Sequence, residues 1–169
     1  LRTVKASVDA TGEGQQFDYF ILSDTNDEKV AAAEAAAAEA WAKEVGDPAR
    51  VVYRRRTVNT GFKAGNLRDF CERWGERYEL MLPLDADSVM AGETILAMAR
   101  MMQAHPKLGI LQSLVVGMPS RSAFARIFQL ACKGAAEKTC DTGLAHRAQM
   151  IAAGADPVGR AVEVTVARQ

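Results

Sequence analysis

Short apolar runs alternate with helical segments along this chain, and that alternation restricts the fold more than any other feature. Each apolar run is bounded by polar or turn-forming residues, which is typical of strands. The expected strands are residues 17–24 (FDYFILSD), 50–56 (RVVYRRR), 78–85 (YELMLPLD) and 108–113 (LGILQS). Alternating strands and helices are typical of parallel strands joined by helical crossovers. The sequence therefore predicts an α/β domain with a mainly parallel sheet flanked by helices.

The helices between these strands are predicted from their spacing and their ends. The first covers residues 27–45, is rich in alanine, and stops at Gly46 and Pro48. The second has a buried face made by Leu67, Phe70, Cys71 and Trp74. The third follows Gly92, buries Ile95, Met98, Ala99 and Met102, and ends near His105.

Length and charge limit the organisation and the partners. A chain of 169 residues with 49% hydrophobic content suits a single domain over residues 1–169. Its 21 basic and 21 acidic residues balance, which argues against nucleic acid or a membrane surface as a partner bound through bulk charge. No apolar run reaches the ~18 residues of a membrane span, so we expect a soluble chain. Cys71, Cys132 and Cys140 lack metal-type spacing, which favours free thiols in a reducing compartment.

Carboxylates follow two of the predicted strands. Asp24 ends the first strand, and Asp85 and Asp87 follow the third. Ligands of open α/β sheets bind outside the carboxyl ends of the strands, so these side chains are expected at one edge. Two carboxylates at i and i+2 repel each other unless they are solvated, protonated or bridged by a cation such as Mg²⁺ or Mn²⁺. Each aspartate alone also fits an ordinary turn.

A basic segment lies between the second strand and the second helix. It contains Arg54, Arg55, Arg56 and Lys63, together with Gly61 and Gly65. Glycines allow close approach of the backbone, and a helix N-terminus with nearby basic side chains favours an anion. A solvated basic loop explains the same composition. The spacing is not that of a Walker phosphate loop.

Several stretches, in this order and spacing, resemble the cytoplasmic catalytic domain of the glucans biosynthesis glucosyltransferase H family. This family is a branch of the family 2 glycosyltransferases related to cellulose synthase. The resemblance is strongest over residues 17–129, and residues 130–169 diverge. The K-A-G-N and D-A-D motifs together are more specific than either alone. The stretches are FILSDT, YRRRTVNTGFKAGNLRDFCERWG, LDADSVM and LGILQS.

The resemblance implies a Rossmann-like GT-A fold and an inverting transfer of glucose from UDP-glucose to a growing β-glucan. It also implies Mg²⁺ or Mn²⁺ as cofactor, a glucan acceptor and a periplasmic product. The family's catalytic domain lies at the cytoplasmic face of the bacterial inner membrane. Its membrane segments are not expected within these 169 residues.

The family's site residues carry over onto matching positions. Asp24 matches the carboxylate that contacts the nucleotide, and Lys63 and Asn66 match the K-A-G-N segment near the donor diphosphate. Asp85 and Asp87 match the metal-binding D-x-D, with Asp87 as the expected direct ligand. Because negative charge develops on the departing diphosphate, we also expect one of Arg54, Arg55 and Arg56 to neutralise it.

The chain also departs from the family pattern. The family's first strand, P-V-Y-N-E, is not found, and the opening LRTVKASV looks like the helix that follows it. The T-E-D or H-D base motif and the Q-x-x-R-W acceptor motif are not found either, so the catalytic base is unknown. Asp141, His146 and Asp156 fit turn or surface positions better than a catalytic role.

Two functions therefore remain open from the sequence. The first is an active glycosyltransferase domain, and the second is a catalytically incomplete nucleotide-sugar-binding or structural fragment. A nucleotidyltransferase is disfavoured because no Gly-rich phosphate loop follows the first strand. In the divergent tail, residues 123–131 keep helical spacing, and AVEVTVA alternates like a strand that covers a sheet edge.

Overall fold

The computed structural model describes residues 1–86, 88–113, 149–152 and 163–168, with side chains described up to residue 113. By its internal contacts the chain divides into two units, Leu1–Leu111 with Gln149–Gln169, and Gln112–Ala148. Nearly all of the second unit lies outside the described residues, and the helix expected over 123–131 falls there. The fold described below is that of the first unit. The single domain over 1–169 stays a prediction.

The described elements follow the predicted alternation closely. Every predicted strand and helix up to residue 113 is present, with ends within a few residues of those expected. The opening residues form a helix, as expected. The elements are α1 (Arg2–Asp9), η1 (Gly14–Gln16), β1 (Phe17–Ser23), α2 (Glu28–Val45), η2 (Pro48–Arg50), β2 (Val51–Arg55), α3 (Phe62–Trp74), η3 (Gly75–Arg77), β3 (Tyr78–Leu84), α4 (Gly92–Ala104), β4 (Ile110–Gln112), β5 (Gln149–Ala152) and β6 (Glu163–Arg168).

Local sequence explains why α2 begins and ends where it does. The Asp27 side chain accepts hydrogen bonds from the backbone N–H groups of Lys29 and Val30, at 2.8 and 3.2 Å. These N–H groups have no partner inside the helix, so an aspartate at the N-cap satisfies them. At the other end Gly46 has φ of 76°, a left-handed conformation that glycine adopts without steric cost. Both ends of α2 are therefore encoded locally.

The strands form one mixed sheet in the order β2-β1-β6-β3-β5-β4. β1 pairs with β2 in parallel, with Tyr19 opposite Val51. β6 pairs antiparallel with both β1 and β3, so β1 and β3 run in the same direction on either side of it. The α/β class is confirmed, but the sheet is not mainly parallel: the β1–β2 pair is parallel, whereas β1–β6, β3–β6 and β3–β5 are antiparallel.

The tail of the chain accounts for this difference. The expected strand in AVEVTVA is present as β6, but its expected place at a sheet edge is wrong, because it lies between β1 and β3. A strand that returns through the middle of a sheet pairs on both sides, and here both pairings are antiparallel. Hydrophobic alternation predicts a strand but carries no information about its neighbours.

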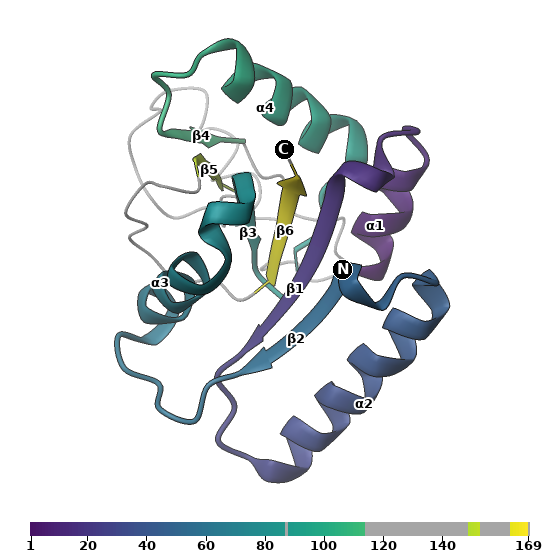
Figure 1. Ribbon diagram of the computed structural model, residues 1–169, viewed down its shortest axis with the longest axis vertical. Helices are drawn as coiled ribbons and strands as arrows, with labels where there is room; N and C mark the ends of the chain where they lie inside the picture. The colour runs from purple at the N-terminus through teal and green to yellow at the C-terminus, as the bar shows by residue number, and fades with distance from the viewer. Residues whose placement is uncertain (87, 114–148, 153–162, 169) are drawn as a thin grey trace, which may run out of the picture. The chain divides into compact units, whose positions relative to one another are not determined.

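Helices α2 and α3 pack on opposite faces of the sheet, on either side of β1 (Figure 1). Consecutive residues of a strand point to opposite faces. Phe20 of β1 contacts Phe70 of α3, with ring centroids 4.9 Å apart. Tyr19, the preceding residue, contacts Trp41 of α2 at 5.7 Å. Phe20 and Phe70 belong to a buried cluster that also contains Leu22, Leu67, Tyr78 and Met81.

Helices α1 and α4 pack against each other through a close backbone approach. The backbone N–H of Gly92 donates to Ser7 Oγ at 2.8 Å. Val4 and Val8 of α1 and Ile95 and Met102 of α4 are buried. Among the described residues, no helix is both long and apolar enough to cross a membrane.

Candidate functional site

The predicted site residues lie where β1, β2 and β3 end. Asp24 directly follows β1, Arg54 and Arg55 are the last residues of β2, and Asp85 directly follows β3. These three strands run in the same direction, so their carboxyl ends share one edge of the sheet. The loop between β2 and α3 lies at the same edge, because it begins at Arg56.

Asp24 forms a bidentate ion pair with Arg56. Arg56 Nε donates to Asp24 Oδ1 at 2.8 Å, and Nη2 donates to Oδ2 at 2.6 Å. The hydrogen bonds that Arg56 donates to Asp24 are the main cause that raises the pKa of Arg56 above its ordinary value. The Arg56 side chain is only 8% exposed, whereas that of Asp24 is 23% exposed. The pair therefore joins the end of β1 to the start of the β2–α3 loop.

The same guanidinium holds the loop that leads into α3. Arg56 Nη1 donates to the carbonyl of Thr60 at 3.1 Å, and Nη2 donates to that of Phe62 at 2.9 Å. Gly61 and Phe62 both have positive φ, 72° and 48°. A bulky residue rarely adopts positive φ, so the backbone at Phe62 is strained. Gly65 permits this arrangement, since a Cβ there would lie 2.0 Å from the carbonyl oxygen of Thr60.

Lys63 and Asp85 are in direct contact. Lys63 Nζ, in the first turn of α3, donates to Asp85 Oδ1 beyond the end of β3. The Lys63 side chain is 9% exposed, and that of Asp85 is 33% exposed. The structure thus brings together the lysine of K-A-G-N and the first aspartate of D-A-D. Asp87 lies outside the described residues, so its predicted role as a direct metal ligand stays a prediction.

Asn66 is fully buried between α3 and β1. Its side-chain Nδ2 donates to the main-chain carbonyl of Leu22 at 3.2 Å. The main-chain carbonyl of Asn66 accepts from Arg54 Nη2 at 2.9 Å. Its Oδ1 has no hydrogen-bond partner among the described residues. In this structure Asn66 therefore ties the start of α3 to the sheet, and its side chain is closed to solvent.

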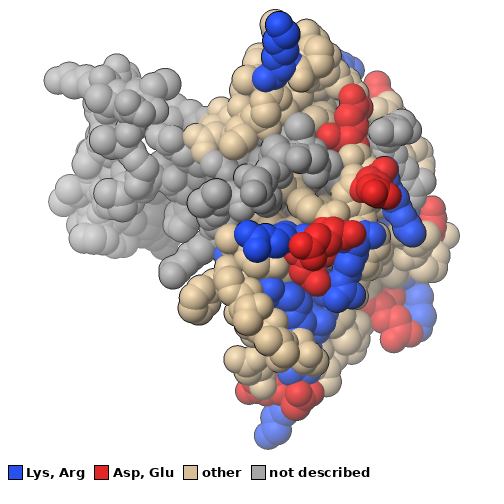
Figure 2. All heavy atoms as spheres, turned by 60° about the vertical axis from the view of Figure 1, so that its left-hand side comes forward, with Lys and Arg blue, Asp and Glu red and all other residues tan. Residues whose placement is uncertain are grey.

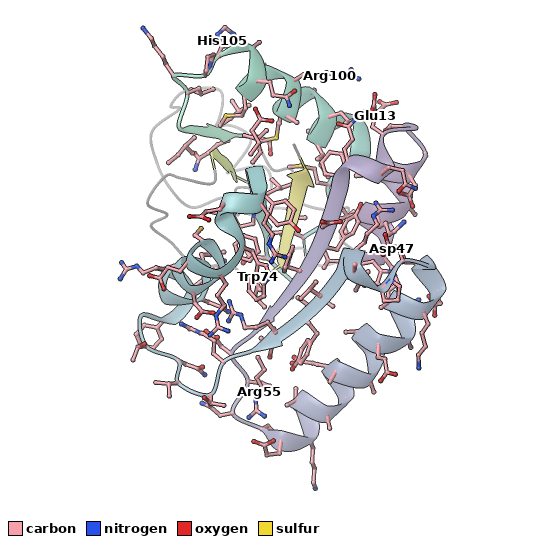
Figure 3. All side chains as sticks on the ribbon, viewed as in Figure 1. Glu13, Asp47, Arg55, Trp74, Arg100 and His105 are labelled. Atoms are coloured by element: carbon pink, nitrogen blue, oxygen red, sulfur yellow. The ribbon has the colours of Figure 1, made fainter. Side chains whose placement is uncertain are left out.

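The other two arginines have carboxylate partners of their own. Arg54 is buried and lies 3.1 Å from Asp69, and burial lowers its pKa below the ordinary value. Arg55, labelled in Figure 3, forms two hydrogen bonds with Glu28 at 2.9 and 2.8 Å. The hydrogen bond to Glu28 is the main cause that raises the pKa of Arg55. Each of the three predicted diphosphate arginines is thus neutralised within the protein.

A pocket of about 350 Å³ lies beside the first turns of α3. It shares Arg56 with the site, and its other lining residues include Thr60, Gly61 and Gly65. Basic and acidic side chains lie next to one another over the face that Figure 2 presents. In the described part of this face, charges of both signs are thus interspersed.

Sequence reasoning missed some of the residues that shape this edge. Asn59 Nδ2 donates to the carbonyl of Asp24 and, at 3.1 Å, to Asn26 Oδ1. Glu28 and Asp69 provide the partners of Arg55 and Arg54. The nearby glycines Gly61 and Gly65 indicated a close approach of the backbone, but nothing in the sequence indicated which acid pairs with which base.

The carboxylate oxygens of Asp85 are of the type that binds a hard divalent cation. Asp85 supplies a partly exposed carboxylate, and carboxylate oxygen is the ligand that Mg²⁺ and Mn²⁺ prefer. Within the described ranges, which omit Asp87, no group of three or more His, Cys, Asp or Glu side chains is arranged to hold a metal. Among the described residues, Asp85 is therefore a single candidate ligand, and its carboxylate is paired with Lys63.

Comparison with known proteins identifies relatives by sequence. The chain is 44% identical over 133 residues to glucans biosynthesis glucosyltransferase H of Dickeya dadantii, a match that covers 79% of this chain and 16% of that protein. The proteins of the same name from Caulobacter vibrioides and Pseudomonas putida are each 43% identical, over 79% of this chain and 20% and 16% of their own lengths. No family model matches the chain, and no solved structure matches it significantly.

These matches place the chain among the glycosyltransferases. More particularly, it belongs to the glucans biosynthesis glucosyltransferase H family, as the sequence motifs implied. The chain spans only about a sixth to a fifth of the length of these relatives.

Proposed function

We propose that this chain forms the donor-binding part of a glucosyltransferase that uses UDP-glucose and extends a β-glucan by an inverting transfer. The observation that carries the proposal is the contact between Lys63 of K-A-G-N and Asp85 of D-A-D at the shared strand ends. The names of the relatives support glucosyl transfer in glucan synthesis. The fold that we propose for the complete domain is of the GT-A type.

The site residues have separate roles in this proposal. Asp24 contacts the nucleoside, and Asp85 with Asp87 holds Mg²⁺ or Mn²⁺. When bound, the ion supplies Lewis-acid stabilisation of the negative charge on the departing diphosphate. Lys63 and Arg56 add positive charge beside that diphosphate, and preorganised charge of this kind is effective because it does not have to reorient during the reaction. Asn66 fixes α3 so that Lys63 is correctly placed.

The proposal extends to the whole protein as the family resemblance implies. The glucan acceptor would be bound with the help of segments outside this chain, and the domain would lie at the cytoplasmic face of the inner membrane. Donor binding without turnover is the second candidate function. It is the alternative that the sequence leaves open.

Calorimetry with UDP and Mn²⁺ tests donor binding. We expect binding that weakens at least about tenfold, or ~1.4 kcal/mol, in Asp87→Ala and in Asp85→Ala, because each variant removes a carboxylate ligand. Glu93→Ala is the matched control, since it removes an exposed carboxylate from the first turn of α4. Binding of equal strength in EDTA, or in a variant lacking both Asp85 and Asp87, would contradict the metal assignment.

Turnover separates the two candidate functions. Release of UDP from UDP-glucose, measured with a coupled assay in the presence of a glucan acceptor, supports the active enzyme. Donor binding without UDP release supports the binding fragment.

A further inference from the structure

We propose that the pocket beside α3 is a saccharide subsite, which receives glucose units of a β-linked glucan outside the donor site. The pocket has a volume of about 350 Å³, within the range of about 300–1,000 Å³ that is usual for small-molecule sites. Its walls come from the loop after β2 and from the side of α3 that does not carry buried Leu67 and Phe70. The inference rests on the proposed function for its choice of glucose, and it adds a contact that the strand ends do not supply.

The charges that line the pocket balance one another. Arg56 and Arg68 are basic, and Asp69 and Glu72 are acidic. A bound anion would be repelled by the two carboxylates, and a bound cation would be repelled by the two guanidinium groups. The lining therefore favours a ligand that is polar and uncharged.

Two of these four side chains already have partners inside the protein. The three nitrogens of the Arg56 guanidinium donate to Asp24 and to two carbonyls of the following loop. Asp69 lies 3.1 Å from the guanidinium of buried Arg54. Arg56 and Asp69 thus form a fixed wall of the pocket.

The other two side chains are available to a ligand. Arg68 and Glu72 are exposed and lie one helical turn apart on the same side of α3. Within the part of the chain that the structure describes, neither takes part in an ion pair. A guanidinium group only donates hydrogen bonds and a carboxylate only accepts them, whereas a sugar hydroxyl does both. Neighbouring hydroxyls of one glucose unit can therefore accept from Arg68 and donate to Glu72.

Apolar side chains at the pocket suit the remaining surface of a sugar. Val58 lines the pocket and is 67% exposed, and Phe62, directly after the lining residue Gly61, is 74% exposed. The hydrogen bond from Arg56 to the carbonyl of Phe62 holds the backbone from which this aromatic ring projects. The C–H groups on the faces of a glucose ring pack on such side chains, and the negative face of an aromatic ring attracts them. The pocket thus combines apolar contact with a few polar groups, as small-molecule sites do.

Titration of the isotope-labelled 169-residue chain, followed by NMR, tests the subsite. The probes are sophorose, laminaribiose and cellobiose, three β-linked glucose disaccharides. We expect at least one of them to shift the backbone amide resonances of Gly61 and Gly65, which line the pocket. Inorganic phosphate should leave these resonances unchanged, because the carboxylates of the lining repel it. Shifts with phosphate and none with a disaccharide would contradict a saccharide ligand.

Variants on α3 identify the groups that bind. Arg68→Ala and Glu72→Ala should each weaken disaccharide binding about fivefold or more, because each removes hydrogen bonds to a charged group. Arg77→Ala and Glu76→Ala are the matched controls, since they remove exposed charges of the same kind from η3, outside the lining. Equal binding by all four variants would refute the subsite.

Calorimetry with UDP and Mn²⁺ separates this inference from the proposed function. Arg68→Ala and Glu72→Ala should bind UDP like the unaltered chain, because neither residue belongs to the strand ends. If UDP binds but no disaccharide shifts Gly61 and Gly65, the subsite is refuted and the donor site stands. If the disaccharides bind as expected and UDP does not, the proposed donor function fails and the saccharide subsite stands.

Discussion

At the scale of single residues, the charged side chains of the candidate site neutralise one another. Arg56 pairs with Asp24, Lys63 with Asp85 and Arg55 with Glu28. These pairs contribute differently to stability. An exposed pair such as Arg55–Glu28 contributes little to the free energy of unfolding, whereas removing one partner of a buried pair is destabilising because it leaves a buried charge unpaired. In the structure each of these three basic side chains is therefore paired with a carboxylate.

Tyr19 is a buried residue whose hydroxyl group is not hydrogen-bonded among the described residues. Its side chain is fully buried, and its hydroxyl has no hydrogen-bond partner among the described residues. Burial is the main cause that raises the pKa of Tyr19 above the ordinary value. The neutral phenol is thus strongly preferred in the folded state.

We predict that Tyr19→Phe is at least as stable as the unaltered chain, and more stable by about 1 kcal/mol, because it removes a buried polar group without breaking a bond. Because burial raises the folded pKa of Tyr19, the fold keeps its stability below the unfolded pKa, about 10, and loses stability as pH rises above that value. Urea unfolding from pH 7 to 11 should show a smaller alkaline loss in the variant. A large loss of stability at pH 7 would reveal an essential hydroxyl bond.

At the scale of secondary structure elements, glycines decide how closely some of them approach. Gly65 lets the start of α3 lie against the carbonyl of Thr60, and Gly92 lets α4 lie against α1. A Cβ on Gly92 would lie 2.2 Å from the Ser7 carbonyl oxygen and 2.7 Å from Val8 Cα. Because these are backbone atoms, they cannot rotate away as a flexible side chain would.

Gly92→Ala is therefore expected to lower the free energy of unfolding by about 1–3 kcal/mol, the usual range for overpacking. Gly109→Ala is the control, since a Cβ at Gly109 meets no atom within 4 Å. Urea unfolding followed by circular dichroism gives both values. Equal stabilities of the two variants would show that α1 and α4 do not meet through Gly92.

At the scale of the whole molecule, the sheet depends on a strand from the end of the chain. β6 separates β1 from β3 and pairs with both, with Thr165 opposite Tyr19 on one side and Leu82 on the other. Without β6, the hydrogen bonds that join β1 and β3 into one sheet would be lost. The returning tail therefore completes the sheet whose strand ends carry the candidate site.

Thr165→Pro should disrupt the fold, because proline removes a backbone donor and is not tolerated in a strand with neighbours on both sides. We expect a loss of about 3 kcal/mol or more in the free energy of unfolding, measured by urea unfolding. Glu28→Pro, at the first position of α2 where proline is tolerated, provides a control for the general effect of proline. Unaltered stability of Thr165→Pro would show that β6 does not pair as described.

Much of this molecule follows from its sequence. The strands β1 to β4 and the helices α2 to α4 were predictable from hydrophobic spacing and from local signals such as Asp27 and Gly46 at the ends of α2. The motifs predicted which residues gather at the strand ends, and Lys63 and Asp85 do meet. These inferences succeed because they depend on residues close together in the chain or on short motifs.

Only the tertiary structure decided the remaining features. It placed β6 inside the sheet, made most of the pairings antiparallel, and chose Asp24 for Arg56 and Asp85 for Lys63 across separations of 32 and 22 residues. Hydrophobic alternation and charge are the same whichever neighbour a strand or an ion selects. The choice of neighbour depends on packing of the whole chain, which local sequence does not encode.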